Sequence, residues 1–299
     1  MAHIILLGAG ASYGSGDVDP YPPPLGNMLF EKLESLGKTA SRLPDHLKET
    51  FKNNFEEGMK EFISYEYNIN FDLMTFQREL AGYLLKFTPR EENNYIKLIE
   101  SIRSRRVIFA SLNYDLLLEL AASKKGLKVN YSNKYFDGSI RILKIHGSSN
   151  FWHDTQSIEI SNGVVSGGNF DYDIPVRPLG HPESILRYLK EDSVAPAMSL
   201  FAEGKPIRTS PQYVSKQQMM WFESLTKCSK LFIIGVRVHQ IDEHIWTKIA
   251  KSNAIVHYYG FPSDEPEFND WKNKFNRKDA TFHLSDFTKA ISHIEKLAK

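Results

Sequence analysis

The chain has 299 residues, of which 41% are hydrophobic and 24% are charged, and its formal net charge is +1. This composition is ordinary for a soluble globular protein, and the near-zero charge gives no global reason to expect strong nucleic-acid or membrane binding. The single cysteine, Cys228, excludes an intramolecular disulfide and a zinc site built from several cysteines.

Targeting signals are not expected either. No segment approaches the ~18 consecutive apolar residues that a membrane-spanning helix needs. The first apolar run is too short for a signal peptide and has no basic leader. We therefore predict a cytoplasmic protein that does not associate with a membrane.

The first stretch is an apolar run, Ile4–Leu7, that passes directly into the glycine-rich sequence Gly8–Gly16. This pattern predicts a buried strand that stops at a tight turn. Because Gly8 and Gly10 carry no Cβ, the backbone can turn sharply and approach a ligand closely. A helix that begins after such a turn directs its first N–H groups at a pyrophosphate. In the alternative interpretation, the turn is a strand–turn–helix joint whose small residues serve packing.

Prolines and then helices are expected after this turn. Residues 19–26 contain four prolines, which predicts an extended, semi-rigid segment and a candidate lid over a cofactor. A helix is expected from about Asn27 to Leu36. Residues 44–104 show helical spacing of apolar residues, which predicts three or four further helices. Their breaks are expected near Gly58, Asn70 and Pro89.

The second convincing strand begins only at Val107. In a dehydrogenase the second strand of the first βαβ unit follows within ~30 residues. An ordinary dehydrogenase is therefore disfavoured.

From Val107 onward, strands and helices alternate. Strands are expected at 107–111, near Val129, and at 140–145, 231–235, 254–259 and 280–284, with a hairpin at 157–166. Helices are expected at 115–121, 183–189, 212–228, 242–252 and 265–275, and from Ser285. The alternation predicts an α/β fold with a doubly wound parallel sheet. We expect one domain over 1–299, with a helical insertion at about 40–104 and a loop-rich cover at about 157–211.

Four predicted strands end in glycine or polar residues, at Gly8–Ser12, Ser111–Asp115, His146–Ser149 and Gly235–His239. Ligands of doubly wound sheets bind outside the carboxyl ends of the strands. Each motif alone has a simpler explanation, because Asn113 or Asp115 can cap a helix and His146 can be a buried histidine bonded to a carbonyl. Taken together, the strand ends indicate a nucleotide-processing site.

Four short motifs carry a resemblance to a known family. They are Gly8-Ala9-Gly10-Ala11-Ser12, Asn113-Tyr114-Asp115, Lys144-Ile145-His146-Gly147-Ser148 and Ile233-Ile234-Gly235. In order and spacing they resemble the sirtuin motifs, and the likeness is greatest to the sirtuin-like NAD hydrolases of bacterial anti-phage defence. The resemblance implies a sirtuin-like Rossmann fold and an enzyme that consumes NAD.

The departures from the family pattern concern the acceptor of the reaction. With Cys228 alone, the chain cannot build the four-cysteine zinc module of the sirtuin protein deacylases. The proline-rich run 20–26 replaces the deacylase loop after the glycine turn, and Gly235-Val236-Arg237 stands where the family has Gly-Thr-Ser. These departures favour hydrolysis over peptide deacylation.

The resemblance also implies roles for individual residues. It places Asn113 on the ribose hydroxyls or the attacking water and makes His146 the general base, so these two are the expected catalytic residues. It implies a pyrophosphate held by main-chain N–H groups of the glycine turn, and an Asp115 that orients the Asn113 loop. No metal is expected. NAD binding is expected at Gly8, Ala9, Gly10, Ala11, Ser12, Ser111, Asp115, Gly235, Val236 and Arg237.

The reaction implied is cleavage of the nicotinamide–ribose bond, which gives nicotinamide and ADP-ribose. Two alternatives stay open: a non-catalytic NAD or ADP-ribose module, and a protein deacylase or ADP-ribosyltransferase. An anti-phage effector that depletes cellular NAD must be kept silent until infection. The resemblance implies control by homo-oligomerisation or by a separate partner, such as a ring-forming ATPase or a short Argonaute.

Overall fold

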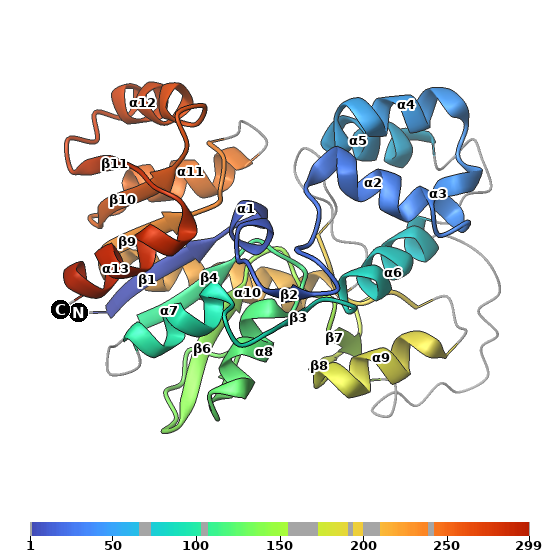
Figure 1. Cartoon of the computed structure of the whole chain (residues 1–299), viewed down its shortest axis with the longest axis horizontal. Coiled ribbons are helices and arrows are strands. Elements are labelled where there is room, and N and C mark those ends of the chain that lie inside the picture. Colours follow the sequence, from blue (N-terminus) through green and yellow to red (C-terminus); the bar gives the residue numbers. More distant parts are fainter. Residues whose placement is uncertain are drawn as a thin grey trace.

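The computed structural model describes residues 2–65, 73–102, 107–154, 173–190, 194–199, 210–238 and 242–298. Its centre is a seven-stranded sheet with the strand order β11-β10-β9-β1-β4-β6-β5 (Figure 1), and all of its neighbouring strands pair in parallel. The predicted α/β class with a parallel sheet is therefore confirmed. The strands are β1 (Ala2–Leu7), β4 (Val107–Ser111), β5 (Lys128–Asn130), β6 (Ser139–Lys144), β9 (Cys228–Ile234), β10 (Ile255–Gly260) and β11 (Ala280–Leu284).

Helices cover both faces of this sheet. Ile5 and Leu7 of β1 belong to the apolar core under α7 (Asn94–Ile102), α8 (Leu117–Lys124) and α13 (Phe287–Leu297). Ile4 and Leu6 belong to the core under α10 (Pro211–Thr226), α11 (Glu243–Lys251) and α12 (Glu265–Lys274). Successive side chains of a strand point to opposite faces, so a strand buried on both sides must be apolar throughout. This explains the uninterrupted apolar run of β1.

A helical module lies beyond the carboxyl end of β1 (Figure 1). It consists of α2 (Gly26–Glu34), α3 (Thr39–Arg42), α4 (Asp45–Asn53), α5 (Phe55–Tyr65) and α6 (Leu73–Leu84). Its core is aromatic, and the rings of Phe30 and Phe51 stack with their centroids 4.4 Å apart. Part of the expected helical insertion therefore lies in this module, while α7 packs on the sheet, and the apolar side chains of the module continue the core that contains Ile5 and Leu7 of β1.

The breaks between these helices differ from the predicted ones. Gly58 lies inside α5, so the break expected there is wrong. A Cβ at Gly58 would lie 2.5 Å from the Phe51 ring, so this glycine permits close packing of α4 on α5. The chain breaks instead at Asn54, whose Oδ1 accepts a bond from the Glu56 N–H (3.0 Å). Asn70 lies outside the described residues.

Small elements connect the module to the sheet. After α1 (Ala9–Tyr13), the strand β2 (Val18–Asp19) pairs with β3 (Thr88–Pro89), and Arg90 contacts Asp19 at 2.5 Å. The proline-rich segment is thus anchored at its start.

The sequence patterns missed β7 (Phe151–His153) and β8 (Val176–Pro178), which pair antiparallel and precede α9 (His181–Leu189). The expected hairpin at 157–166 lies outside the described residues. Among the helices that the structure describes, none is long and apolar enough to cross a membrane.

Two neighbouring histidines, His257 of β10 and His283 of β11, predict a pH-dependent stability. Nδ1 of His257 lies 3.0 Å from Nε2 of His283, and burial lowers the pKa of His257 to about 4, with His283, His293 and Lys230 acting in the same direction. An unfolded histidine titrates near ~6.5, so below that pH the unfolded chain binds more protons than the folded one. Stability is therefore expected to fall as the pH drops from ~6.5 toward ~4.

Thermal unfolding between pH 7.5 and pH 5 measures this effect. His257→Phe keeps a ring on Phe232, which His257 stacks against, and removes the titrating group. The melting temperature of the variant is expected to fall less on acidification than that of the wild-type chain. An equal loss in both proteins would contradict the assignment.

Candidate functional site

The four polar strand ends predicted from the sequence meet at one edge of the sheet. Their strands β9, β1, β4 and β6 are consecutive neighbours, with Leu7 paired to both Ile234 and Ser111, and Ser111 paired to Lys144. The chain runs from β1 toward β4 and returns later to β9 on the other side, so the strand order reverses beside β1. Such a reversal is the usual ligand position in open α/β sheets.

The glycine turn packs directly on the end of β9. The N–H groups of Gly8 and Gly10 donate to the carbonyls of Ile234 and Gly235 (both 3.0 Å), and the Ala11 N–H donates to the Gly8 carbonyl (2.9 Å). A Cβ at Gly8 would lie 2.3 Å from the Gly235 oxygen. Close backbone packing therefore explains why residues 8 and 10 are glycines.

This packing bears on the expected pyrophosphate contacts. The N–H groups of Gly8, Gly10, Ala11 and Ser12 are expected to hold a pyrophosphate, and in this structure those of Gly8, Gly10 and Ala11 donate to protein carbonyls. Ligand binding by the turn stays a prediction. It has to use groups of the turn other than the N–H groups of Gly8, Gly10 and Ala11.

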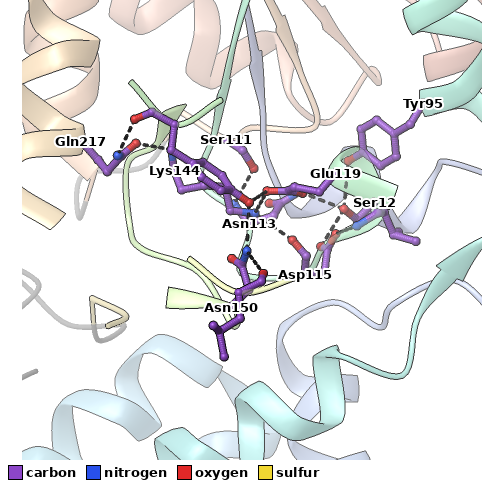
Figure 2. A network of polar contacts seen from close by, with 12 residues as sticks. Ser12, Tyr95, Ser111, Asn113, Asp115, Glu119, Lys144, Asn150 and Gln217 are labelled. Carbon is purple, nitrogen blue, oxygen red and sulfur yellow. Dashed lines mark hydrogen bonds and ion pairs between the residues drawn. The ribbon is translucent and has the colours of Figure 1, made fainter. Parts of the chain in front are cut away.

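Asn113 ties this turn to the end of β4 (Figure 2). Its Nδ2 donates to the Gly8 carbonyl (2.8 Å) and to Ser12 Oγ (2.9 Å). Its main-chain N–H donates to Ser111 Oγ (3.1 Å). Asn113 therefore does not cap a helix, and both of its amide hydrogens are engaged within the protein.

Ser12 connects Asn113 to Asp115 in the same network. Ser12 Oγ donates to Asp115 Oδ2 (2.8 Å), and Tyr95 Oη lies 2.9 Å from Ser12 Oγ. Because the one hydroxyl proton of Ser12 goes to Asp115, Tyr95 must be the donor of its bond. Burial, reinforced by the charge of Asp115, raises the pKa of Tyr95, so the phenol keeps this proton.

Asp115 thus contacts the glycine turn and Asn113 through Ser12, and its role in orienting the Asn113 loop stays a prediction. Its Oδ1 also accepts from the Leu117 N–H (3.1 Å) at the start of α8.

Beside Asp115 lies a buried ion pair that sequence reasoning did not single out (Figure 2). Lys144 Nζ donates to the Asp115 carbonyl (2.8 Å) and lies 3.2 Å from Glu119 Oε1, with side-chain exposures of 1% for Lys144 and 7% for Glu119. Burial raises the pKa of Glu119, while the ammonium of Lys144 opposes that shift. A lysine at the end of an apolar strand was the only signal for this pair.

Removing Lys144 tests the pair. Lys144→Met leaves the Glu119 carboxylate buried without its cation, and loss of one buried partner costs about 3 kcal/mol or more of unfolding free energy. Urea denaturation measures the change. Lys289→Met serves as the matched control, because Lys289 is 78% exposed beside Asp286 and its loss should change stability little. Equal effects of the two substitutions would contradict a structural role for the buried pair.

His146 follows β6 and is 3% exposed. Its Nε2 lies 3.8 Å from Oδ1 of Asp242, and its carbonyl accepts from the Ser199 N–H (2.7 Å). Asp242 occupies the N-cap position of α11 (Glu243–Lys251), but its side chain makes no capping bond there and faces His146 instead.

The surroundings of His146 are closed by segments from other parts of the chain. Tyr114 Oη donates to the Ser199 carbonyl, and burial raises the pKa of Tyr114, with the charges of Asp242 and Glu56 acting in the same direction. Gln77 of α6 holds this segment from the other side by donating to the carbonyls of Pro196 (2.9 Å) and Met198 (3.3 Å). The helical module is thereby joined to the His146 loop.

The strand end that follows β9 contributes less to this buried site. Val236 is buried and its carbonyl accepts from Tyr258 Oη (2.6 Å). The Arg237 side chain is 68% exposed and lies 3.9 Å from Glu267, so the structure does not bring it to Asn113 or His146. His239 lies outside the described residues. Within the described part of the chain, no group of His, Cys, Asp or Glu side chains has the arrangement of a metal site.

No family model matches the chain, and no curated protein matches it. Among solved structures, it is similar to a Sir2 homologue with a histidine-to-asparagine substitution in complex with ADP-ribose, with a TM-score of 0.51, 14% identity, and coverage of 99% of this chain and 91% of that one. A Sir2 homologue in complex with NAD gives a TM-score of 0.47 and 13% identity, over 99% and 89% of the two chains. The parallel sheet, its flanking helices and the first of these likenesses establish that the chain has a Sir2-like Rossmann fold.

Proposed function

We propose that this chain binds NAD across the carboxyl ends of β9, β1, β4 and β6 and hydrolyses its nicotinamide–ribose bond. The observation that carries the proposal is the placement of Asn113 and His146 at the ends of neighbouring strands beside the glycine turn. The fold supports it, because the Sir2 homologue of similar fold was solved with ADP-ribose, one product of that reaction.

An acceptor beside the glycine turn fits a ligand of this kind. Asn113 has its amide hydrogens engaged, which leaves its Oδ1 to accept a bond from a ribose hydroxyl.

His146 acts as the base in the proposed reaction. A water oxygen bonds to C1′ of the ribose, the bond from C1′ to nicotinamide breaks, and nicotinamide leaves with that electron pair. His146 takes the proton of the water, and the carboxylate of Asp242 stabilises the imidazolium that results. The buried segment 194–199 limits the access of bulk water.

Asp242→Asn tests whether the Asp242 carboxylate assists His146. The substitution removes the charge beside His146, so we expect kcat to fall about tenfold or more with KM nearly unchanged, because the charge matters most when the imidazolium forms. Glu267→Gln is the matched control, since it removes a carboxylate that lies beside the exposed Arg237. A rise in KM at constant kcat would show that Asp242 acts in binding instead.

One observation favours a second function, that of a non-catalytic NAD or ADP-ribose module. Both amide hydrogens of Asn113 hold the turn together, as a purely structural asparagine would. Incubation of the purified chain with NAD, followed by mass spectrometry, separates the two functions. A hydrolase releases nicotinamide and ADP-ribose in equal amounts over time. A binding module is stabilised by ADP-ribose in thermal unfolding but releases no nicotinamide.

We propose further that this hydrolysis depletes cellular NAD in anti-phage defence. The support is the resemblance of the sequence motifs to those of the defence NAD hydrolases. Control then comes from a homo-oligomer or from a regulatory partner of the ring-forming ATPase or short Argonaute type. Expression of the wild-type chain together with such a partner during phage infection is expected to lower cellular NAD, and expression of His146→Ala is not.

A further inference from the structure

The segment 195–199 is buried and lies against the loop that carries His146. The Ser199 N–H donates to the His146 carbonyl (2.7 Å), and the Ser148 N–H donates to the Ala197 carbonyl (3.1 Å). The segment therefore holds the main chain both at His146 and just after it.

No gap separates this segment from the loop. Gly147, which lies between the two bonds, has a φ of +82° and pairs with Met198 in an antiparallel bridge. A Cβ at Gly147 would lie 2.2 Å from the Ala197 oxygen. Because protein interiors are closely packed, a shift of the segment is passed on to the peptide group of His146. The Cα–Cβ bond of His146 turns with that peptide group, so the segment sets the direction of the imidazole.

The helical module holds the segment through one buried side chain. Gln77 of α6 is 3% exposed, and its Nε2 donates to the carbonyls of Pro196 (2.9 Å) and Met198 (3.3 Å). A carbonyl can only accept, so both partners require the amide nitrogen on their side. Gln77 therefore fixes the segment before and after Ala197, the residue that bonds to the His146 loop.

The neighbours of Gln77 on α6 are tied to the interior of the module. The ring of Phe76 packs on that of Phe62, with their centroids 5.3 Å apart. Glu79 accepts from the N–H (3.1 Å) and from Oγ1 (2.9 Å) of Thr39. Gln77 is therefore carried by a packed body, and its position follows that of the module.

We propose that Gln77 is a positioning residue for His146, and that the helical module sets the direction of the catalytic imidazole through Gln77 and the segment 195–199. Gln77 acts through main chain and does not act on the reacting atoms. The inference rests on the proposed function, because it concerns the base of the proposed hydrolysis. It gives the module, which carries none of the residues assigned above to NAD, a part in the reaction.

Gln77→Met tests this role, because methionine keeps an unbranched side chain of similar length and removes both N–H donors. We expect kcat for nicotinamide release to fall at least about tenfold, since a misplacement of about 1 Å can cost about 100-fold. KM for NAD should change less than about threefold, because the substitution removes no group assigned to NAD. Thr39→Val is the matched control, since it removes a buried hydrogen bond to Glu79 of the same helix. It should lower the melting temperature and leave kcat unchanged.

NMR separates positioning from a loss of stability. The imidazole resonances of His146, assigned with His146→Ala, report the surroundings of the ring without NAD. They should shift in Gln77→Met and stay in place in Thr39→Val. Gln77→Glu repeats the test with a side chain of the same shape if the methionine variant does not fold, because a carboxylate donates to neither carbonyl.

The outcomes that would overturn this inference differ from those that bear on the proposed function. Unchanged kcat or unchanged His146 resonances in a folded Gln77 variant would overturn it, as would an equal loss of kcat in Thr39→Val. A wild-type chain that releases no nicotinamide would instead overturn the proposed function. The resonances would then still show whether Gln77 positions the His146 ring.

Discussion

Replacing His146 with alanine is expected to lower the rate of NAD hydrolysis by about 100-fold or more, the usual scale for the loss of a general base. The residue sits at the end of β6, buried and beside the carboxylate of Asp242. Alanine removes the imidazole that would accept the proton of the attacking water. Initial rates of nicotinamide release, measured by chromatography at saturating NAD, give the change in kcat.

The control for this substitution is His46→Ala on α4 of the helical module, where the His46 side chain is 50% exposed beside Glu61. It should leave the rate unchanged. Thermal unfolding of each variant shows whether the fold survives. A folded His146→Ala protein with the activity of the wild-type chain would remove His146 from the reaction.

Replacing Gly235 with alanine is expected to cost more than about 4 kcal/mol of unfolding free energy, or to prevent folding altogether. Gly235 has a φ of +64°, and a Cβ there would lie 2.0 Å from the Ala11 nitrogen. The clash is with main-chain atoms of Gly10 and Ala11. These atoms cannot move without breaking the hydrogen bonds from Gly8 and Gly10 to the end of β9. Urea denaturation measures the cost, and soluble yield reports a variant that does not fold.

Gly138→Ala separates the clash from the backbone strain. Gly138 has a φ of +70°, but a Cβ there meets nothing within 4 Å. Its substitution should cost only about 1 kcal/mol, the strain of a left-handed alanine. If both variants lose the same stability, the turn is not packed against β9 as the structure shows.

Much of the sheet could be predicted from the sequence, because a strand buried on both faces leaves an unmistakable apolar run. The expected strand at 107–111 coincides with β4, which is buried along most of its length. The expected strand at 280–284 coincides with β11, although this edge strand is only partly buried. The pair β7 and β8 was missed because each has only three residues, too few for a pattern. Gly58 was predicted to break a helix, but its lack of a Cβ instead allows close packing against Phe51.

That the four polar strand ends meet could also be predicted, because the carboxyl ends of parallel strands lie at one edge of a sheet. The polar contacts of the site could not. Asp242 stands at the start of the helix expected over 242–252, and only the tertiary fold shows that it faces His146. The pairing of Lys144 with Glu119 depends in the same way on how α8 packs beside β6.

The glycine turn shows where sequence reasoning ends. A residue without a Cβ is equally consistent with close approach of a ligand and close approach of backbone. Both interpretations were therefore open for Gly8 and Gly10 from the sequence. The structure shows close approach of backbone, because both residues pack against Gly235.

A crystal structure of His146→Ala soaked with NAD tests the central claim most directly, because this variant should bind the dinucleotide without cleaving it. We expect intact NAD over the glycine turn, with C1′ of its nicotinamide ribose between Asn113 and residue 146. NAD bound away from the ends of β1, β4 and β6, or strand ends that stay empty at saturating NAD, would contradict the account.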